Sequence, residues 1–202
     1  MAAKDTGGPL AYFCVDIETS GPVPGHYNLL SIGCVACRPV SPGGRLAPGD
    51  ELYLELRPVA PGFEAEAMAV NGLDPARLAR EGLEPKEAMR RLAEFVEARL
   101  PEGGRAIFVG HNAPFDWSFV NYGFHEAGMS NPFGYSALDS KALAMGTLSL
   151  RWPDTNKETL ERLLGLPPQD RTRVHRADYD ARYQALIFCG LIDRLIERGI
   201  RP

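Results

Sequence analysis

The stretch LAYFCVDIET, residues 10–19, organises the chain. Its first six residues are apolar strand formers, after which Asp16 and Glu18 alternate with Ile17. Because side chains alternate between the two faces of a strand, both carboxylates are expected on one face. Two acids side by side repel each other unless a cation lies between them. The pattern is typical either of a divalent metal site or of two solvated acids at a strand end.

Length and composition indicate a globular protein with a sizeable core. The chain has 202 residues, of which 45% are hydrophobic and 24% are charged. We expect a single domain over residues 1–202, with its core at about 10–198. The start, MAAKDTGG, lacks the apolar region of a signal peptide, and no apolar run approaches the roughly 18 residues of a membrane span. A cytoplasmic protein without membrane contact is therefore expected.

The order of the expected elements predicts an α/β protein. Strands are expected at 10–19, 27–37 and 51–57, and Pro/Gly-rich segments join them as antiparallel neighbours. Asn112 is expected to cap the helix at 112–128. The remaining expected elements are helices at 64–70, 85–100, 140–145, 156–164 and 178–198, and strands at 105–109 and 137–139. This order predicts one mixed sheet covered by helices.

The cysteines do not predict a metal site. Cys34 and Cys37 form a single C-x-x-C within an expected strand, where residues three apart face opposite ways. They would not converge on zinc, and we expect all four cysteines to be buried thiols.

Two further acids and a histidine occupy places where chemistry is often found. Asp116 and Asp180 each lie in the first turn of an expected helix, where the helix dipole alone would favour an acid. His175 precedes Asp180 in a polar segment, and it is either a surface residue or a general base beside a metal site. Together with Asp16 and Glu18, these residues could meet over one edge of the sheet and hold two metal ions for phosphodiester cleavage.

The motifs DIETSG, HNAPFD and HRADYDA together resemble the three exonuclease motifs of the DnaQ-like, or DEDD, 3′–5′ exonucleases. The spacing from His175 to Asp180 is similar to that of the histidine subgroup, DEDDh. The resemblance spans about residues 10–195 and implies a ribonuclease H-like, five-stranded mixed sheet.

The resemblance also implies a role for each residue. Asp16, Glu18 and Asp180 would bind one Mg²⁺ or Mn²⁺ ion, and Asp16 would bridge to a second ion with help from Asp116. His175 would take the proton of the attacking water, since a neutral imidazole accepts protons. The residues implied to touch the terminal nucleotide are Thr19, Asn71 and Asn112.

Within the family, the chain resembles ribonuclease T in three segments: EAMAVNGLD at 66–74, except for its Val70, GHNAPFDWSFV at 110–120 and NPF at 131–133. Ribonuclease T has a phenylalanine where this chain has Val70, which removes one stacking surface for terminal bases. Phe63, Phe133 and Tyr135 are either replacement stackers or core residues. Three arginines near His175 are either phosphate contacts or solvated charges: Arg171, Arg173 and Arg176.

The function expected from the sequence is a two-metal 3′–5′ exonuclease that releases nucleoside 5′-monophosphates from single-stranded RNA or DNA 3′ ends. The alternative is an epsilon-like proofreading subunit of a DNA polymerase, which is disfavoured because the chain ends soon after its last expected helix. A binding module with an inactive nuclease fold would have lost an acid or the histidine, and none is lost here. A homodimer is expected only by analogy with ribonuclease T.

Overall fold

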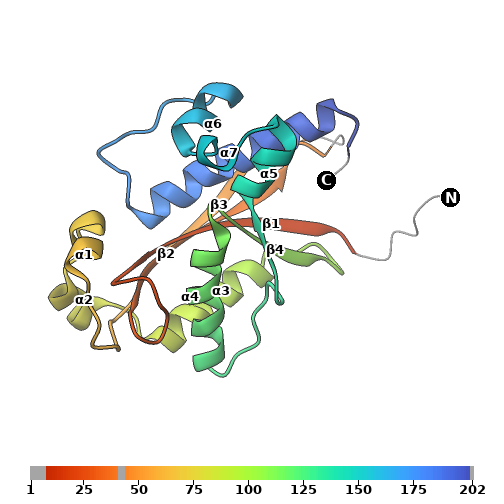
Figure 1. Cartoon of the computed structure of the whole chain (residues 1–202). Helices are drawn as coiled ribbons and strands as arrows, with labels where there is room; N and C mark the ends of the chain where they lie inside the picture. Colours follow the sequence, from red (N-terminus) through yellow and green to blue (C-terminus); the bar gives the residue numbers. More distant parts are fainter. Residues whose placement is uncertain (1–7, 41–43, 201–202) are drawn as a thin grey trace.

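A five-stranded mixed sheet forms the centre of the protein (Figure 1). The computed structural model describes residues 8–40 and 44–200. The strands are β1 (Leu10–Thr19), β2 (Leu29–Pro39), β3 (Leu46–Glu55), β4 (Arg105–Gly110) and β5 (Ala137–Asp139). The helices are α1 (Ala65–Asn71), α2 (Pro75–Glu81), α3 (Pro85–Glu97), α4 (Ala113–Glu126), α5 (Ser140–Leu148), the 3₁₀ turn η1 (Trp152–Asp154), α6 (Lys157–Leu164) and α7 (Ala177–Glu197).

Strand β1 lies in the middle of the sheet, whose order is β3-β2-β1-β4-β5. It pairs antiparallel with β2 along most of its length and parallel with β4 as far as the pair Cys14 and Val109. Beyond that pair, β4 turns into α4, so the last part of β1 has a neighbour on the β2 side alone. This unpaired edge at the carboxyl end of a parallel strand pair is a common place for a ligand site.

The alternation of side chains along β1 divides the core into two layers. Phe13, Val15 and Ile17 pack with residues of α3 and α4 on one face. Tyr12 and Cys14 pack on the other face against α7. In Figure 1, α3 and α4 lie on one side of the sheet, and α5, α6 and α7 lie on the other. The predicted mixed sheet with helices on its faces is confirmed.

The N-terminus of α7 lies directly on β2. A Cβ atom added to Gly33 would lie 1.9 Å from the carbonyl oxygen of Ala177, the first residue of α7. Gly33 is also the partner of Asp16 across the strand pair. Because only glycine allows this approach, Gly33 sets the distance between the start of α7 and the acidic part of β1.

The structure corrects three expectations about the elements. Strand β3 begins at Leu46 rather than at residue 51, because an edge strand with an irregular register tolerates Pro48 and Gly49. Helix α2 was missed, although Asp74 caps it and Pro75 opens it. Asn112 precedes α4 in a left-handed conformation, and its side chain makes no capping hydrogen bond.

The cysteine prediction is confirmed for the described part of the chain. All four cysteines are free and buried. Cys34 packs on the α3–α4 face of the sheet and Cys37 on the α7 face, as their spacing predicts. Within residues 8–40 and 44–200, none of the helices has the length and apolar character that crossing a bilayer requires.

Candidate active site

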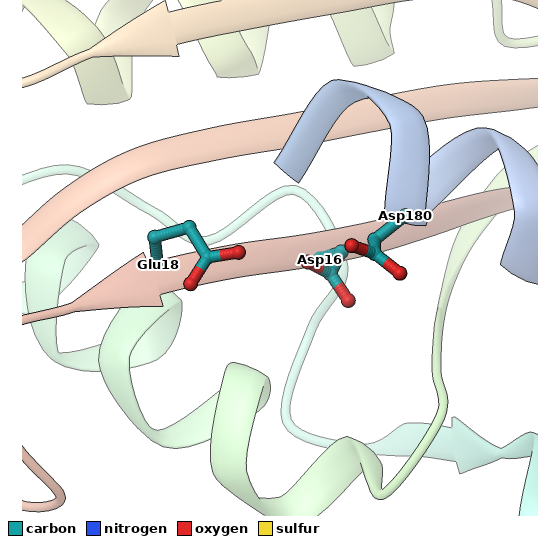
Figure 2. A group of neighbouring side chains, drawn as sticks. All are labelled: Asp16, Glu18 and Asp180. Carbon is teal, nitrogen blue, oxygen red and sulfur yellow. The ribbon is translucent and has the colours of Figure 1, made fainter. Parts of the chain in front are cut away.

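Three carboxylates converge where β1 passes beneath the start of α7. Asp16 and Glu18 continue the α7-facing series that begins with Tyr12 and Cys14, so β1 presents both acids to α7. Asp180 comes from the first turn of α7 and is buried. One oxygen from each of the three side chains lies within 4.8 Å of the others (Figure 2). The structure thus brings together acids that are more than 160 residues apart.

Asp116 approaches the same strand from the opposite layer. It lies in the first turn of α4 and is buried. Its Oδ1 accepts a hydrogen bond of 3.2 Å from the backbone N–H of Ile17. Since β4 no longer pairs with β1 at this point, Asp116 supplies the acceptor that the sheet does not. The bond fixes Asp116 beside the residue that separates Asp16 from Glu18.

Burial and the charges of neighbouring acids raise the pKa values of Asp16, Glu18 and Asp116. Burial is the main cause that raises the pKa of Asp16 well above its ordinary value, and the neighbouring Asp116 carboxylate raises it further. The positive charge of Lys157 acts in the opposite direction and lowers this pKa. Burial and the charge of Asp180 raise the pKa of Glu18 to about 8. Burial also raises the pKa of Asp116. Without a metal ion, Asp16, Glu18 and Asp116 therefore hold protons near neutral pH, as expected of acids arranged for a positively charged ligand.

His175 contacts this cluster through its backbone. Its N–H donates a hydrogen bond of 2.7 Å to Oδ2 of Asp180. The residue is exposed and has a left-handed backbone with φ of 66°. His175 lines a cavity of about 420 Å³ between α6 and the segment before α7. The structure therefore places His175 beside the acids, with its backbone rather than its ring hydrogen-bonded to Asp180.

A second cavity, of about 300 Å³, shares Glu18 with the acid cluster. Two of the three residues expected to touch a nucleotide lie along it: Thr19 and Asn71. The side chain of Asn71 donates a hydrogen bond of 3.0 Å to the carbonyl oxygen of Thr19, which ties α1 to the end of β1. Asn112 does not line this cavity, and its backbone N–H instead donates to Asp139.

Aromatic side chains contribute little to the walls of this cavity. Val70 and Phe115 both line it, and Phe115 is its one aromatic wall among the described residues. Phe133 is a core residue that packs against Phe13 and Phe108, so it is not a free stacking surface. Phe63 and Tyr135 are exposed, Tyr135 to 94%, and neither lines the cavity.

The three arginines near His175 differ in their contacts. Arg176 forms an ion pair of 3.0 Å with Asp178, and the guanidinium of Arg173 lies 4.8 Å from the centre of the Tyr179 ring. Arg171 is exposed and lies 4.0 Å from Glu158. These contacts lie outside the acid cluster, so the structure does not assign the arginines to the site.

Two residues of the site were missed in the sequence. Lys157, the first residue of α6, forms an ion pair with Oδ1 of Asp180. Gln184 donates a hydrogen bond from Nε2 to Oδ1 of Asp16. Gln184 follows Asp180 by one helical turn, so its position in the buried stripe of α7 was a detectable signal. Nothing in the sequence near Lys157 indicated that it reaches Asp180.

The donor set fits a small divalent cation. Carboxylate oxygens are the ligands that Mg²⁺ and Mn²⁺ prefer, and ligands at about 2.0–2.2 Å from an ion lie up to about 4.4 Å apart. Small side-chain movements would bring the oxygens of Asp16, Glu18 and Asp180 into that range. The Oε1 atom of Gln184 is buried and has no partner among the described residues, so a polar ligand beside it would satisfy an otherwise unpaired acceptor.

Two curated proteins are similar in sequence to most of this chain. The chain is 39% identical over 188 residues to the 3′-5′ DNA exonuclease Cap18 of Escherichia coli, across 93% of this chain and 94% of that protein. It is 33% identical over 193 residues to ribonuclease T of Yersinia enterocolitica, across 93% and 87% of the two chains. The identity to Cap18 is therefore higher than the identity to this ribonuclease T.

Two solved structures share the fold at low sequence identity. The nuclease domain of 3′hExo, described as a DEDDh family member bound to rAMP, superposes with a TM-score of 0.69 at 9% identity, over 95% of this chain and 93% of that one. A full-length 3′-exonuclease superposes with a TM-score of 0.74 at 12% identity, and the match spans 95% of this chain and 62% of that chain. These two likenesses show the fold alone.

The family assignment rests on the sequence relationship and on the matched length. Residues 13–188 match the exonuclease family, a span that contains all four acids and His175. The expected 3′–5′ exonuclease class is confirmed at the level of the family, while the substrate and the residue roles are matters for proposal. The chain therefore belongs to the exonuclease family represented by Cap18 and ribonuclease T.

Proposed function

We propose that this protein is a metal-dependent 3′–5′ exonuclease that releases nucleoside 5′-monophosphates from single-stranded 3′ ends, with the histidine subgroup's arrangement of residues. The observation that carries the proposal is the convergence of Asp16, Glu18 and Asp180 at the end of a cavity that shares Glu18 with them. A 3′-terminal nucleotide in that cavity would have its phosphodiester beside the acids. We further propose that one exonuclease domain covers the chain, with its core at about 10–198.

Each residue of the cluster has a role in this proposal. Asp16, Glu18 and Asp180 would hold one Mg²⁺ or Mn²⁺ ion, and Asp16 together with Asp116 would hold a second. Two bound ions supply an activated water and stabilise the charge on the leaving oxygen. Asp116 also keeps β1 in place through Ile17. The raised pKa of Glu18 means that metal binding would displace a proton from this side chain at neutral pH.

His175 would accept the proton of the attacking water. Its backbone is already hydrogen-bonded to Asp180, and we expect the imidazole to reach the cluster when the side chain and the preceding segment rearrange. The left-handed φ of His175 is strained for a residue with a Cβ, which favours a segment that rearranges when substrate binds.

The cavity wall gives an expectation about the terminal nucleotide. Phe115 would stack on a base, and Thr19 and Asn71 border the same space. With Val70 in the wall, discrimination between bases by stacking is expected to be weaker than in a wall with more aromatic residues. The higher identity to a DNA exonuclease supports testing DNA ends before RNA ends.

The test uses matched single-stranded DNA and RNA oligonucleotides that carry a label on the 3′-terminal nucleotide. With Mg²⁺ or Mn²⁺, the purified protein should release labelled 5′-mononucleotides, and EDTA should stop the release. The variants Asp16→Asn and Asp180→Asn should bind the oligonucleotide without cleaving it. If protein that binds metal cleaves no single strand of either kind, the proposal is wrong.

Two expectations from the sequence need experiments of their own. A proofreading subunit would use the same acids, so co-purification with a DNA polymerase is what would distinguish it from a free-standing exonuclease. The homodimer also stays a prediction, which light scattering at working concentration would test.

A further inference from the structure

Lys157 is a half-buried cation beside the acid cluster. It opens α6, and 23% of its side chain is exposed. Its ammonium forms an ion pair with Oδ1 of Asp180, and its charge also acts on Asp16, Glu18 and Asp116, whose pKa values burial raises. Across residues 8–40 and 44–200, Lys157 is the one Lys or Arg that forms an ion pair with any of these four acids.

The place of Lys157 in its helix does not explain its presence. The N-terminus of a helix carries partial positive charge, so a lysine at the first helical position is unfavourable there. Asn156 already caps this helix by accepting a hydrogen bond of 2.9 Å from the N–H of Thr159. The acid cluster is therefore what stabilises Lys157 in this position.

The pairing occupies a carboxylate that the proposed metal site needs. Oδ1 of Asp180 is engaged by Lys157, while Oδ2 accepts the N–H of His175. A divalent ion and the ammonium would compete for the same oxygen, because two cations on one carboxylate oxygen repel each other. Metal binding at Asp180 consequently requires Lys157 to move away.

We propose that Lys157 couples metal loading to substrate binding. In the free protein its ammonium pairs with Asp180 and holds that side chain in place. When the phosphate of a 3′-terminal nucleotide lies beside the acids, the ammonium transfers to a phosphate oxygen and releases Asp180 for the ion. This inference rests on the proposed function, because it requires a phosphate next to the cluster.

The side chain suits this exchange. Lysine is a compact point charge on a flexible stem, and its three donors can rotate from a carboxylate to a nearby phosphate without a fixed geometry. Because binding equilibria are reciprocal, a phosphate that draws Lys157 away strengthens metal binding by the same factor as metal strengthens phosphate binding. Lys157 is thus assigned as a positioning residue for the cation.

The experiment measures Mn²⁺ affinity without any turnover. The full-length protein is treated with EDTA, dialysed, and titrated with Mn²⁺ by calorimetry and by electron paramagnetic resonance. The titration is made with and without AMP as a phosphate-bearing probe, and binding of Mn²⁺ to AMP alone is subtracted. Wild type, Lys157→Met and Lys157→Arg are compared, with Lys141→Met as the matched control. Lys141 is a half-buried lysine that stacks on Trp152 and forms no ion pair with the four acids.

We expect Lys157→Met to bind Mn²⁺ about tenfold more tightly than wild type when AMP is absent, since a competing cation has been removed. AMP should tighten Mn²⁺ binding about tenfold in wild type and much less in Lys157→Met. Lys157→Arg should bind Mn²⁺ within about threefold of wild type, because a cation remains at the cluster. Lys141→Met should match wild type in both titrations.

Two results would overturn the inference. One is an unchanged or weaker Mn²⁺ affinity in Lys157→Met, provided that this variant is folded, as shown by cooperative melting in EDTA. The other is an equal effect of AMP in wild type and in that variant. The comparison without AMP does not depend on catalysis. If the protein cleaved no strand, the proposed function would be refuted, but the titration would still decide whether Lys157 competes with the metal ion.

Discussion

The substitution Glu18→Gln should stabilise the metal-free protein while abolishing its proposed activity. Burial and the charge of Asp180 raise the pKa of Glu18 from an ordinary 4.5 to about 8. Between these two pH values the folded protein binds more protons than the unfolded chain, so stability falls as pH rises through this window. The loss is absent below about pH 4.5 and complete above about pH 8.

The size of the effect follows from the same pKa. A carboxyl group whose pKa rises from 4.5 to about 8 on folding would lower the free energy of unfolding by up to about 4 kcal/mol at pH 7.5. Glu18 is half-buried and lies beside other acids, so part of the repulsion is screened or relieved by neighbours that hold protons. We therefore expect Glu18→Gln to raise the free energy of unfolding by about 2–4 kcal/mol at pH 7.5, which raises the melting temperature by roughly 4–16 °C in a chain of this length.

The assay is urea and thermal denaturation in EDTA at pH 5 and pH 7.5. The matched control is Glu102→Gln, which makes the same change at an exposed loop acid and should stay within about 0.5 kcal/mol of wild type. The gain from Glu18→Gln should shrink at pH 5, and added Mg²⁺ should stabilise wild type but not the variant. An equal gain at both pH values, or none at pH 7.5, would refute the reasoning.

Substitutions at three further positions test other parts of the site. Asp116→Ala should destabilise the protein by about 1–3 kcal/mol in chemical denaturation, because the N–H of Ile17 loses its acceptor. Asp116→Asn keeps a carbonyl oxygen as acceptor, so this variant should fold normally but show little nuclease activity. Gly33→Ala should push the start of α7 away from β1, and calorimetry should show weaker Mn²⁺ binding even where circular dichroism is unchanged. Val70→Phe should add a stacking surface to the cavity and lower KM for single strands by up to about tenfold, while kcat stays the same. If KM equals that of wild type, the terminal base does not reach this wall.

Much of the fold followed from local patterns. The alternation in residues 10–19 predicts both the strand and the shared face of Asp16 and Glu18, because the period of two is a local property of extended backbone. The long helix near the C-terminus was predicted at 178–198 and forms at Ala177–Glu197, since its apolar stripe specifies a buried face. The start of β3 was not predicted, because its Pro and Gly are tolerated only at the edge of a sheet.

The sequence by itself thus determined which acids are candidates for the site and which elements carry them. Only the tertiary structure decided that Asp180 lies against Asp16, because that approach depends on Gly33 admitting the backbone of Ala177. It alone decided that Lys157 reaches Asp180 and that Asn112 lies away from the cavity lined by Glu18, Thr19 and Asn71. Contacts between residues distant in sequence depend on how helices pack on the sheet, and no local pattern encodes that packing.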